Sequence, residues 1–285
     1  MKTHNLSPLR YPGGKAKLTK FLIDLIQFNN LDGCTYVELF AGGAGAALAL
    51  LLNNIVDDII INDYDNGIYA IWHSILYNTE EFCEMISRTP ITTNEWQQQK
   101  EIYKTTRDLL ELGFATFFLN RTNVSGIIKG GIIGGWDQNK KNKIDCRFTK
   151  NELINRIRKI ALYKDKITLY NLDAGEFIMT KCNQIPDKSL IYFDPPYYKM
   201  GPQLYTNFYM DNDHRELSNL IKEHISTPWI ITYDDCDEIS SLYNGYRQDK
   251  YYLNYSVKKK YTGKEIIIYS EKILPCNSAN IKYCV

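Results

Sequence analysis

Apolar residues near the start of the chain are spaced as in an amphipathic helix. Within residues 15–28 the apolar side chains fall three or four positions apart and so share one helical face. The next apolar run, 36–40 (YVELF), predicts a short strand, and the glycine-rich residues 41–45 connect it to an alanine- and leucine-rich helix. A second strand pattern over 58–62 and a helical stretch to Ile75 complete a strand–helix–strand start, which is typical of a doubly wound sheet.

From about residue 76 to 165 the pattern changes to helical periodicity and polar loops, which indicates a lobe inserted into the sheet. This part includes a helical stretch over 95–112 and a glycine-rich loop over 126–136. The sequence therefore predicts an α/β fold, with a Rossmann-like sheet domain built from residues 1–75 and 166–285 and a mainly helical lobe over 76–165. The later strands are expected at 167–172, 189–193, 229–232, 248–253 and 265–269.

Composition indicates a folded, globular protein, since hydrophobic residues make up 44% and aromatic residues 13% of the 285 positions. The first residues lack the unbroken apolar core of a signal peptide, and no run is long enough for a membrane helix, so we expect a cytoplasmic protein. The seven cysteines are scattered without a C-x-x-C pair. We therefore expect reduced thiols and neither a disulfide framework nor a metal site.

Charge is distributed unevenly, although the formal net charge is only +1. Residues 138–166 carry 10 Lys/Arg against 3 Asp/Glu, which leaves 24 against 30 in the rest of the chain. A basic segment on an otherwise acidic body is what a polyanion-binding surface requires. A solvated helix face would have the same composition, and composition alone does not separate the two interpretations.

The glycine-rich loop follows a strand and opens a helix, so it lies at the sheet edge where ligands bind in folds of this kind. Gly42, Gly43 and Gly45 leave out side chains where a backbone approaches a ligand closely. The loop lacks the third glycine of the G-x-G-x-x-G dinucleotide pattern, although Asp63, about 20 residues on, suits a ribose hydroxyl in either class of cofactor. A loop that serves only strand-to-helix packing is the alternative.

Asp194, Pro195, Pro196 and Tyr197 follow the apolar strand 189–193 and so face the same crevice. Two consecutive prolines stiffen the backbone and supply no N–H donor, which leaves carbonyl acceptors beside the Asp194 carboxylate. A carboxylate and a carbonyl together suit an amino group, and Tyr197 offers a stacking face for a base taken out of a duplex. A rigid proline turn with an exposed Asp is the structural alternative.

Seven segments together resemble the Dam-type family (D12 class, alpha order) of DNA adenine-N6 methyltransferases. They are RYPGGK (10–15), YVELFAGGAG (36–45), IINDYD (60–65), FFLNRTNVSG (117–126), NLDAGEFI (171–178), IYFDPPYY (191–198) and KEIIIYSE (264–271). The resemblance spans almost the whole chain and includes the order of the segments. It implies a Rossmann-like fold that uses S-adenosylmethionine, with an inserted target-recognition lobe.

For the cofactor, the resemblance implies contacts along the carboxyl edge of the sheet. Tyr11 and Lys15 match N-terminal contacts, although a member of the family carries a tryptophan at the position of Tyr11. Asp63 matches the acidic residue that binds the ribose, and Asp173 resembles the one that contacts the adenine; either could instead cap a helix. The other expected contacts to S-adenosylmethionine, and to its product S-adenosylhomocysteine, are Glu38, Phe40, Gly42, Gly43, Gly45 and Asp194.

Within the lobe the resemblance is confined to residues 117–126. Asn120, Arg121 and Asn123 are expected DNA contacts, because Asn suits adenine edges and Arg suits guanine or phosphate. The basic segment lies in this lobe, which favours phosphate contacts as the reason for its charge. Double-stranded DNA is the expected partner of a monomeric protein without membrane association, and a cognate restriction endonuclease is a further candidate. The expected phosphate contacts are Lys140, Lys141, Lys143 and Arg147.

These features predict a site-specific enzyme that methylates N6 of adenine in double-stranded DNA by base flipping, without a metal ion. Asp194 and the Pro195 carbonyl would hold the amino group, and Tyr197 would stack on the base. Enzymes for cytosine-N4, RNA adenine-N6 and protein-glutamine methylation share this pattern of an acidic or amide residue, two prolines and an aromatic residue. They are the alternatives among methyltransferases. A catalytically silent DNA-binding protein and a nicotinamide oxidoreductase are the alternatives from other classes.

Two smaller groups of residues receive no catalytic role. Asp213 and His214 open a predicted helix over 215–223, which favours helix capping by the aspartate and a surface position for the histidine. Three lysines at 258–260 precede the last hairpin turn and suit either DNA backbone contact or solubility.

Overall fold

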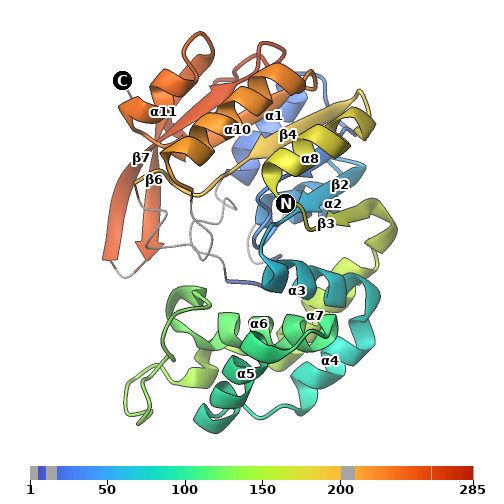
Figure 1. Ribbon diagram of the computed structural model, residues 1–285, viewed down its shortest axis with the longest axis vertical. Helices are drawn as coiled ribbons and strands as arrows, with labels where there is room; N and C mark the ends of the chain where they lie inside the picture. Colours follow the sequence, from blue (N-terminus) through green and yellow to red (C-terminus); the bar gives the residue numbers. More distant parts are fainter. Residues whose placement is uncertain (1–5, 11–17, 200–208, 258, 285) are drawn as a thin grey trace.

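The computed structural model describes residues 6–10, 18–199, 209–257 and 259–284, with the backbone alone over 253–257 and 259–262. These residues form an eight-stranded sheet in the order β3-β2-β1-β4-β5-β7-β6-β8 (Figure 1). The strands are β1 (Thr35–Glu38), β2 (Asp58–Asn62), β3 (Ile167–Tyr170), β4 (Ser189–Phe193), β5 (Trp229–Asp234), β6 (Arg247–Val257), β7 (Lys259–Tyr269) and β8 (Lys282–Tyr283).

Parallel pairing joins β3, β2, β1, β4 and β5, and antiparallel pairing adds β7, β6 and β8. Strand β4 is buried along its whole length, as expected in a parallel sheet that helices cover on both faces. The predicted doubly wound, Rossmann-like α/β fold is therefore confirmed. Its helices are α1 (Thr19–Phe28), α2 (Gly45–Leu52), α3 (Asn66–Tyr77), α4 (Thr79–Arg88), α5 (Thr93–Thr105), α6 (Leu109–Thr122), α7 (Lys150–Ala161), α8 (Ala174–Lys181), α10 (Asp211–His224) and α11 (Asp237–Leu242).

Successive residues of each central strand serve opposite faces of the sheet. Tyr36 of β1 and Tyr192 of β4 pack on the side of α1 and α2, where their rings stack with centroids 6.2 Å apart. Val37, which follows Tyr36, and Ile191, which precedes Tyr192, pack on the side of α8, α10 and α11. The two faces thus have separate cores.

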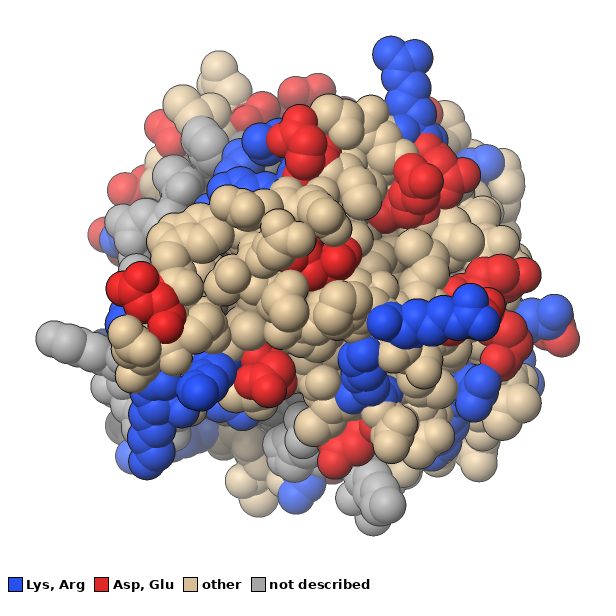
Figure 2. All heavy atoms as spheres, turned by 90° about the horizontal axis from the view of Figure 1, so that it is seen from below, with Lys and Arg blue, Asp and Glu red and all other residues tan. Residues whose placement is uncertain are grey.

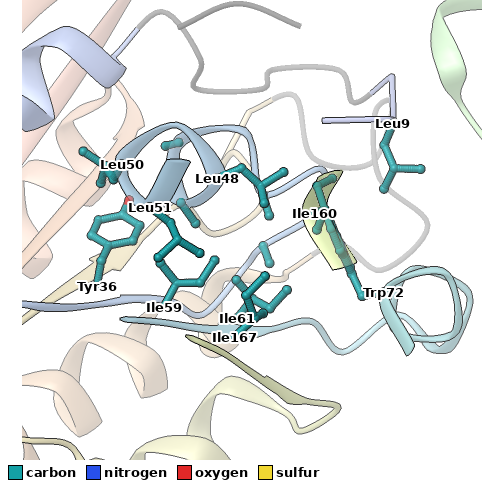
Figure 3. Close-up of a cluster of buried hydrophobic side chains, with 14 of the residues drawn as sticks. Leu9, Tyr36, Leu48, Leu50, Leu51, Ile59, Ile61, Trp72, Ile160 and Ile167 are labelled. Carbon is teal, nitrogen blue, oxygen red and sulfur yellow. The ribbon is translucent and has the colours of Figure 1, made fainter. Parts of the chain in front are cut away.

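The inserted lobe contains α4 to α7 and meets the sheet domain through α3 (Figure 1). Its apolar residues and those on one face of the sheet form one continuous core. Figure 3 shows part of it, with Trp72 of α3 and Ile160 of α7 near Ile61 and Ile167 of the sheet. Because α3 runs to Tyr77, the predicted boundary between residues 75 and 76 falls in its last turn.

Helices α3 and α6 approach closely because each has a glycine at the contact. A Cβ atom on Gly113 of α6 would lie 2.5 Å from both the Ala70 carbonyl oxygen and Ser74 Oγ of α3. A Cβ atom on Gly67 of α3 would lie 2.7 Å from Thr116 Oγ1 of α6. Neither site accommodates a side chain, so the lobe is packed directly against the backbone of α3.

One predicted helix proves to be parts of two. The stretch 95–112 covers most of α5 and the start of α6, with a break before Leu109. Asp108 Oδ1 accepts the Glu111 N–H at 2.9 Å and so caps α6. The spacing of apolar residues gives no sign of the break. A helix start that depends on one side-chain cap is not visible in that spacing.

All seven cysteines are free thiols. In the parts of the chain that the structure describes, no helix combines the length and apolar character needed to cross a bilayer.

Candidate active site

The glycine-rich loop between β1 and α2 is held at both its N–H and carbonyl groups. Gly42 has φ of 47°, a conformation that favours glycine, and its N–H donates to Asp63 Oδ2 at 2.7 Å. Trp72 Nε1 of α3 donates to the Gly42 carbonyl at 2.9 Å. The loop is thereby fixed between the end of β2 and α3, with its backbone at the carboxyl edge of the sheet.

Asp63 follows β2 and uses both carboxylate oxygens. Besides the bond to Gly42, its Oδ1 accepts the Asp65 N–H at 2.9 Å. Burial, and then the nearby Asp65 carboxylate, raise the pKa of Asp63 to about 7. The helix cap of α3 is Asp65, which accepts the Gly67 and Ile68 N–H groups, so capping of α3 is not the role of Asp63.

Asn62, to which the sequence analysis gave no role, ties three strand ends together. Its amide donates to the carbonyls of Leu39 and Leu172, at 3.0 Å each, and its Oδ1 accepts the Leu172 N–H at 2.9 Å. A buried amide at the last position of a strand was the available signal, but its partners follow β1 and β3. Only the sheet order reveals them.

Glu38, the last residue of β1, is 4% exposed and points toward the start of α2. Its Oε2 accepts the Ala47 N–H at 3.3 Å. Burial is the main cause that raises the pKa of Glu38 to about 8, and the neighbouring carboxylates of Asp194 and Asp63 add to it. Asp194, Asp63 and Glu38 therefore lie near one another at this edge. Phe40 is half-buried, and its ring meets the Tyr209 ring edge-on, with the two ring centroids 5.9 Å apart.

The D-P-P-Y loop begins where β4 ends. Asp194 is half-buried, and its Oδ1 accepts the Thr232 hydroxyl of β5 at 3.1 Å. Pro195 and Pro196 are buried. Tyr197 is only 3% exposed, and its hydroxyl donates to Glu265 at 2.6 Å. Stacking of a base on Tyr197 stays a prediction, and it requires the ring to be uncovered.

The loop that follows is held by a carboxylate that the sequence analysis did not single out. Asp234, at the end of β5, accepts the N–H groups of Tyr198 and Lys199 at 2.8 and 2.9 Å. Glu265 belongs to a segment that carries the family resemblance, but no role was assigned to it. The signal for both was an acidic residue bordering an apolar strand, and their targets become visible only when β5 and β7 are paired.

Two expected DNA contacts in the lobe have structural roles instead. Asn120 is 1% exposed; its amide spans Arg10, accepting the N–H at 2.8 Å and donating to the carbonyl at 2.7 Å. Asn123 is fully buried, accepts Trp96 Nε1 at 2.7 Å and donates to the carbonyls of Ile127 and Ile128. The prediction of base contacts by these two residues is therefore corrected, because their polar atoms are occupied by the lobe's own backbone and by Trp96.

Arg121 is also mostly buried, and among the described residues no carboxylate forms an ion pair with it. Its guanidinium donates to the carbonyls of Pro8 and Arg147. In the described part of the chain, no carboxylate forms an ion pair with Arg10, Arg121 or Arg147, which we call the arginine cluster. Burial, followed by the charges of Arg10, Arg156 and Arg147, lowers the pKa of Arg121 to about 9. The cluster is thus short of negative charge.

The expected phosphate contacts are solvent-accessible. Lys140, Lys141, Lys143 and Arg147 are all exposed. Figure 2 views the molecule from the lobe end and shows a group of Lys and Arg side chains at lower left, while basic and acidic side chains are mixed elsewhere on this face. The exposure of these four side chains permits contact with a polyanion.

The family model for the D12 class of N6 adenine-specific DNA methyltransferases matches residues 11–262. The chain belongs to this family. No curated protein matches the sequence. The donor of the methyl group is S-adenosylmethionine, as the family implies.

Several solved structures resemble this D12-class methyltransferase at low identity. A candidate RNA methyltransferase from Pyrococcus horikoshii is 12% identical, with a TM-score of 0.46 over 94% of this chain and 89% of the other. A SAM-dependent methyltransferase from Agrobacterium tumefaciens is 8% identical, with a TM-score of 0.41 over 90% of this chain and 63% of the other. TrmK of M. capricolum in complex with S-adenosylhomocysteine is 10% identical, with a TM-score of 0.37 over 87% and 68%. The family assignment rests on the family model.

The residues at the sheet edge of the D12-class methyltransferase suit its cofactor. Each oxygen of Asp63 accepts one backbone N–H, which leaves lone pairs for the hydroxyls of a ribose. Gly42 and Gly43 bring backbone, without side chains, beside that carboxylate. Asp173 is exposed and accepts the Gly175 N–H at 2.8 Å, so it caps α8. Its contact with the cofactor stays a prediction, and Tyr11 and Lys15 lie outside the described residues.

His214 of the methyltransferase is buried, so its predicted surface position is wrong. It is 1% exposed, its Nδ1 lies 3.0 Å from the Tyr233 hydroxyl, and the rings of Tyr198 and Tyr209 pack against it. The helix begins earlier than predicted, at Asp211, and Asp213 caps it from the third helical position, since its carboxylate accepts the Met210 N–H at 2.7 Å. A predicted helix alone does not reveal which of its faces packs against the sheet, and so the burial of His214 could not be foreseen.

Proposed function

We propose that this methyltransferase transfers a methyl group from S-adenosylmethionine to N6 of adenine in double-stranded DNA, with the target base extruded from the helix. The observation that carries the proposal is the position of Asp194 and two prolines at the end of β4, next to β1 and its glycine-rich loop. The electrostatic influence of Asp194 on Glu38 supports this proximity. An amino-group site thus lies beside a cofactor site.

The chemistry follows from what the loop offers to a planar amino group. S-adenosylmethionine supplies a methyl group on a positively charged sulfur. Asp194 and the Pro195 carbonyl accept hydrogen bonds from the two amino hydrogens and turn the nitrogen lone pair out of conjugation with the ring. As the nitrogen–carbon bond forms, the sulfur–carbon bond breaks, and the amino group then loses one proton to solvent. The residues contribute mainly by positioning.

DNA is supported as the substrate by the uncompensated charge of the lobe. Within the described ranges the arginine cluster has no acidic partner, and Lys140, Lys141 and Lys143 are exposed on the loop before Arg147. Phosphates would supply the missing negative charge, with release of counterions. Arg121 is therefore proposed as a phosphate contact and not as a reader of bases, because its guanidinium is already oriented by two backbone carbonyls.

The test compares methylation in cells that express the wild type, Asp194→Ala or Asp187→Ala. Asp187 is exposed at the opposite end of β4, so its variant is a matched control that leaves the site intact. Modified-base sequencing should find N6-methyladenine in a short motif with the wild type and with Asp187→Ala. Asp194→Ala should lower turnover by at least about 10²-fold, with little change in S-adenosylmethionine affinity.

Three results would contradict the proposal. Near-normal methylation by Asp194→Ala would remove the amino-group site. N4-methylcytosine in the DNA, or methylation of RNA alone, would assign the enzyme to one of the other methyltransferase classes that share the D-P-P-Y chemistry. Failure of the wild type to bind S-adenosylmethionine would favour a silent DNA-binding protein.

A further inference from the structure

Three polar side chains on one face of the sheet hold the D-P-P-Y loop. Thr232 and Asp234 are two residues apart on β5 and so share a face, and Glu265 of β7 lies directly opposite Asp234. We call Thr232, Asp234 and Glu265 the loop anchor. They bind successive parts of the loop, namely the Asp194 carboxylate, the N–H groups of Tyr198 and Lys199, and the Tyr197 hydroxyl.

The loop needs such an anchor because of its own chemistry. Pro195 and Pro196 have no N–H groups, so this part of the backbone offers no donors with which to bind the sheet. Those same prolines leave their carbonyls available to an incoming amino group. The position of the loop is therefore set by side chains from β5 and β7.

Glu265 is the fully buried carboxylate of the anchor. It is 0% exposed and stands next to Ile266, Ile267 and Ile268, which are equally buried. A buried carboxylate is costly unless strong donors satisfy it. The hydroxyls of Tyr197 and Tyr251 both donate to it, from different sides: Tyr197 to Oε1 and Tyr251 of β6 to Oε2. A buried position of the sheet is thus occupied by a hydrogen-bond acceptor for the tyrosine of the D-P-P-Y loop.

We propose that Glu265 is a positioning residue for methyl transfer, which acts by fixing the Tyr197 hydroxyl and thereby the loop that carries Asp194. As far as the reaction is concerned, this inference rests on the proposed function. Tyr197 then has a second role beside any stacking on a base: its hydroxyl is the connection between the amino-group site and the antiparallel part of the sheet.

The kinetic test uses Tyr197→Phe, which keeps the ring and removes only the hydroxyl. We expect kcat to fall by about 10- to 100-fold, with KM for DNA and the Kd of S-adenosylmethionine changed by no more than about twofold. Glu265→Gln, which keeps one carbonyl acceptor, should retain more kcat than Glu265→Ala. The double variant Tyr197→Phe with Glu265→Ala should be no slower than Glu265→Ala alone, because both changes break one connection.

Tyr251→Phe is the matched comparison. It removes the other hydroxyl from the same carboxylate, so it costs a similar buried hydrogen bond without touching the loop. Its decrease in kcat should be much smaller than that of Tyr197→Phe. Equal decreases for the two variants, or fold-losses that multiply in the double variant, would overturn the inference and make the network simply structural.

Hydrogen–deuterium exchange tests the same connection without relying on any substrate. Tyr197→Phe and Glu265→Ala should accelerate exchange of the Tyr198 and Lys199 amides, which Asp234 holds in the wild type, and Tyr251→Phe should accelerate it less. Unchanged exchange in Tyr197→Phe would overturn the inference, whatever the enzyme methylates. Failure of the wild type to methylate DNA, with accelerated exchange in Tyr197→Phe, would instead contradict the proposed function alone.

Discussion

Substitution of Gly113 by alanine tests whether the lobe is packed directly on the backbone of α3. In the interior of a free helix, Gly→Ala stabilises by about 1 kcal/mol. At Gly113 the new methyl group would lie 2.5 Å from the Ala70 carbonyl oxygen, which belongs to the backbone and cannot rotate away. Overpacking of this kind costs about 1–3 kcal/mol. With the contact so short we take the upper end, which leaves a net destabilisation of about 2 kcal/mol.

The assay is thermal or urea unfolding of purified protein. For a chain of this size, about 2 kcal/mol corresponds to a decrease in Tm of roughly 4–8 °C. Gly131→Ala is the control, because a Cβ atom there meets nothing within 4 Å; its effect should stay within about 0.5 kcal/mol. An increase in Tm for Gly113→Ala would refute the reasoning. It would mean that the gain in helix propensity outweighs the cost of the contact with α3, and so that this contact is not tight.

Two further predictions concern the ligands. Because the pKa of Asp63 is raised to about 7, its carboxylate gains a proton as the pH falls below 7 and then accepts ribose hydroxyls less well. Calorimetry should therefore show that S-adenosylmethionine binds about tenfold more weakly at pH 6 than at pH 8. Asp63→Asn should bind S-adenosylmethionine weakly at both pH values. If the wild type bound it equally well at pH 6 and pH 8, Asp63 would not be the ribose contact. Changing Lys140, Lys141 and Lys143 to Gln should make the slope of log K against log salt for duplex DNA less steep by about 0.9 per lost phosphate contact. Lys272→Gln, at an exposed position after β7, should leave the slope unchanged, and an unaltered slope in the triple variant would exclude these lysines from the interface.

The strands and the order of the main segments could be predicted because they depend on local patterns. Apolar runs such as 58–62 and 189–193 coincide with β2 and β4, and the loops that follow them fall at the same edge of the sheet. The D-P-P-Y loop and Asp63 were therefore placed correctly relative to the strands. The α5–α6 break was missed, since a single capping residue decided it.

Residues whose roles depend on distant partners could not be predicted. Asn120 and Asn123 look like base-reading residues in sequence, but the fold places Arg10 and Trp96 beside them, and those partners use their amides. Glu265 and Asp234 look like the polar ends of strands, and only the pairing of β5 with β7 places them together beneath the D-P-P-Y loop. A side chain with two hydrogen-bonding ends has many potential partners, and the tertiary structure chooses among them.

The core that the lobe shares with the sheet has a consequence for engineering. A recognition module cut out at residues 76 and 165 and grafted into a relative would expose the buried face of α6, where Phe114, Phe117 and Phe118 lie, and would leave α3 without the surface it packs against. Changes to the proposed phosphate contacts are better made in the exposed loop around Lys140 to Lys143, while the inward face of α6 and Gly113 are retained. In this architecture the exposed surface of the lobe can be varied, but the lobe itself is not a transferable unit.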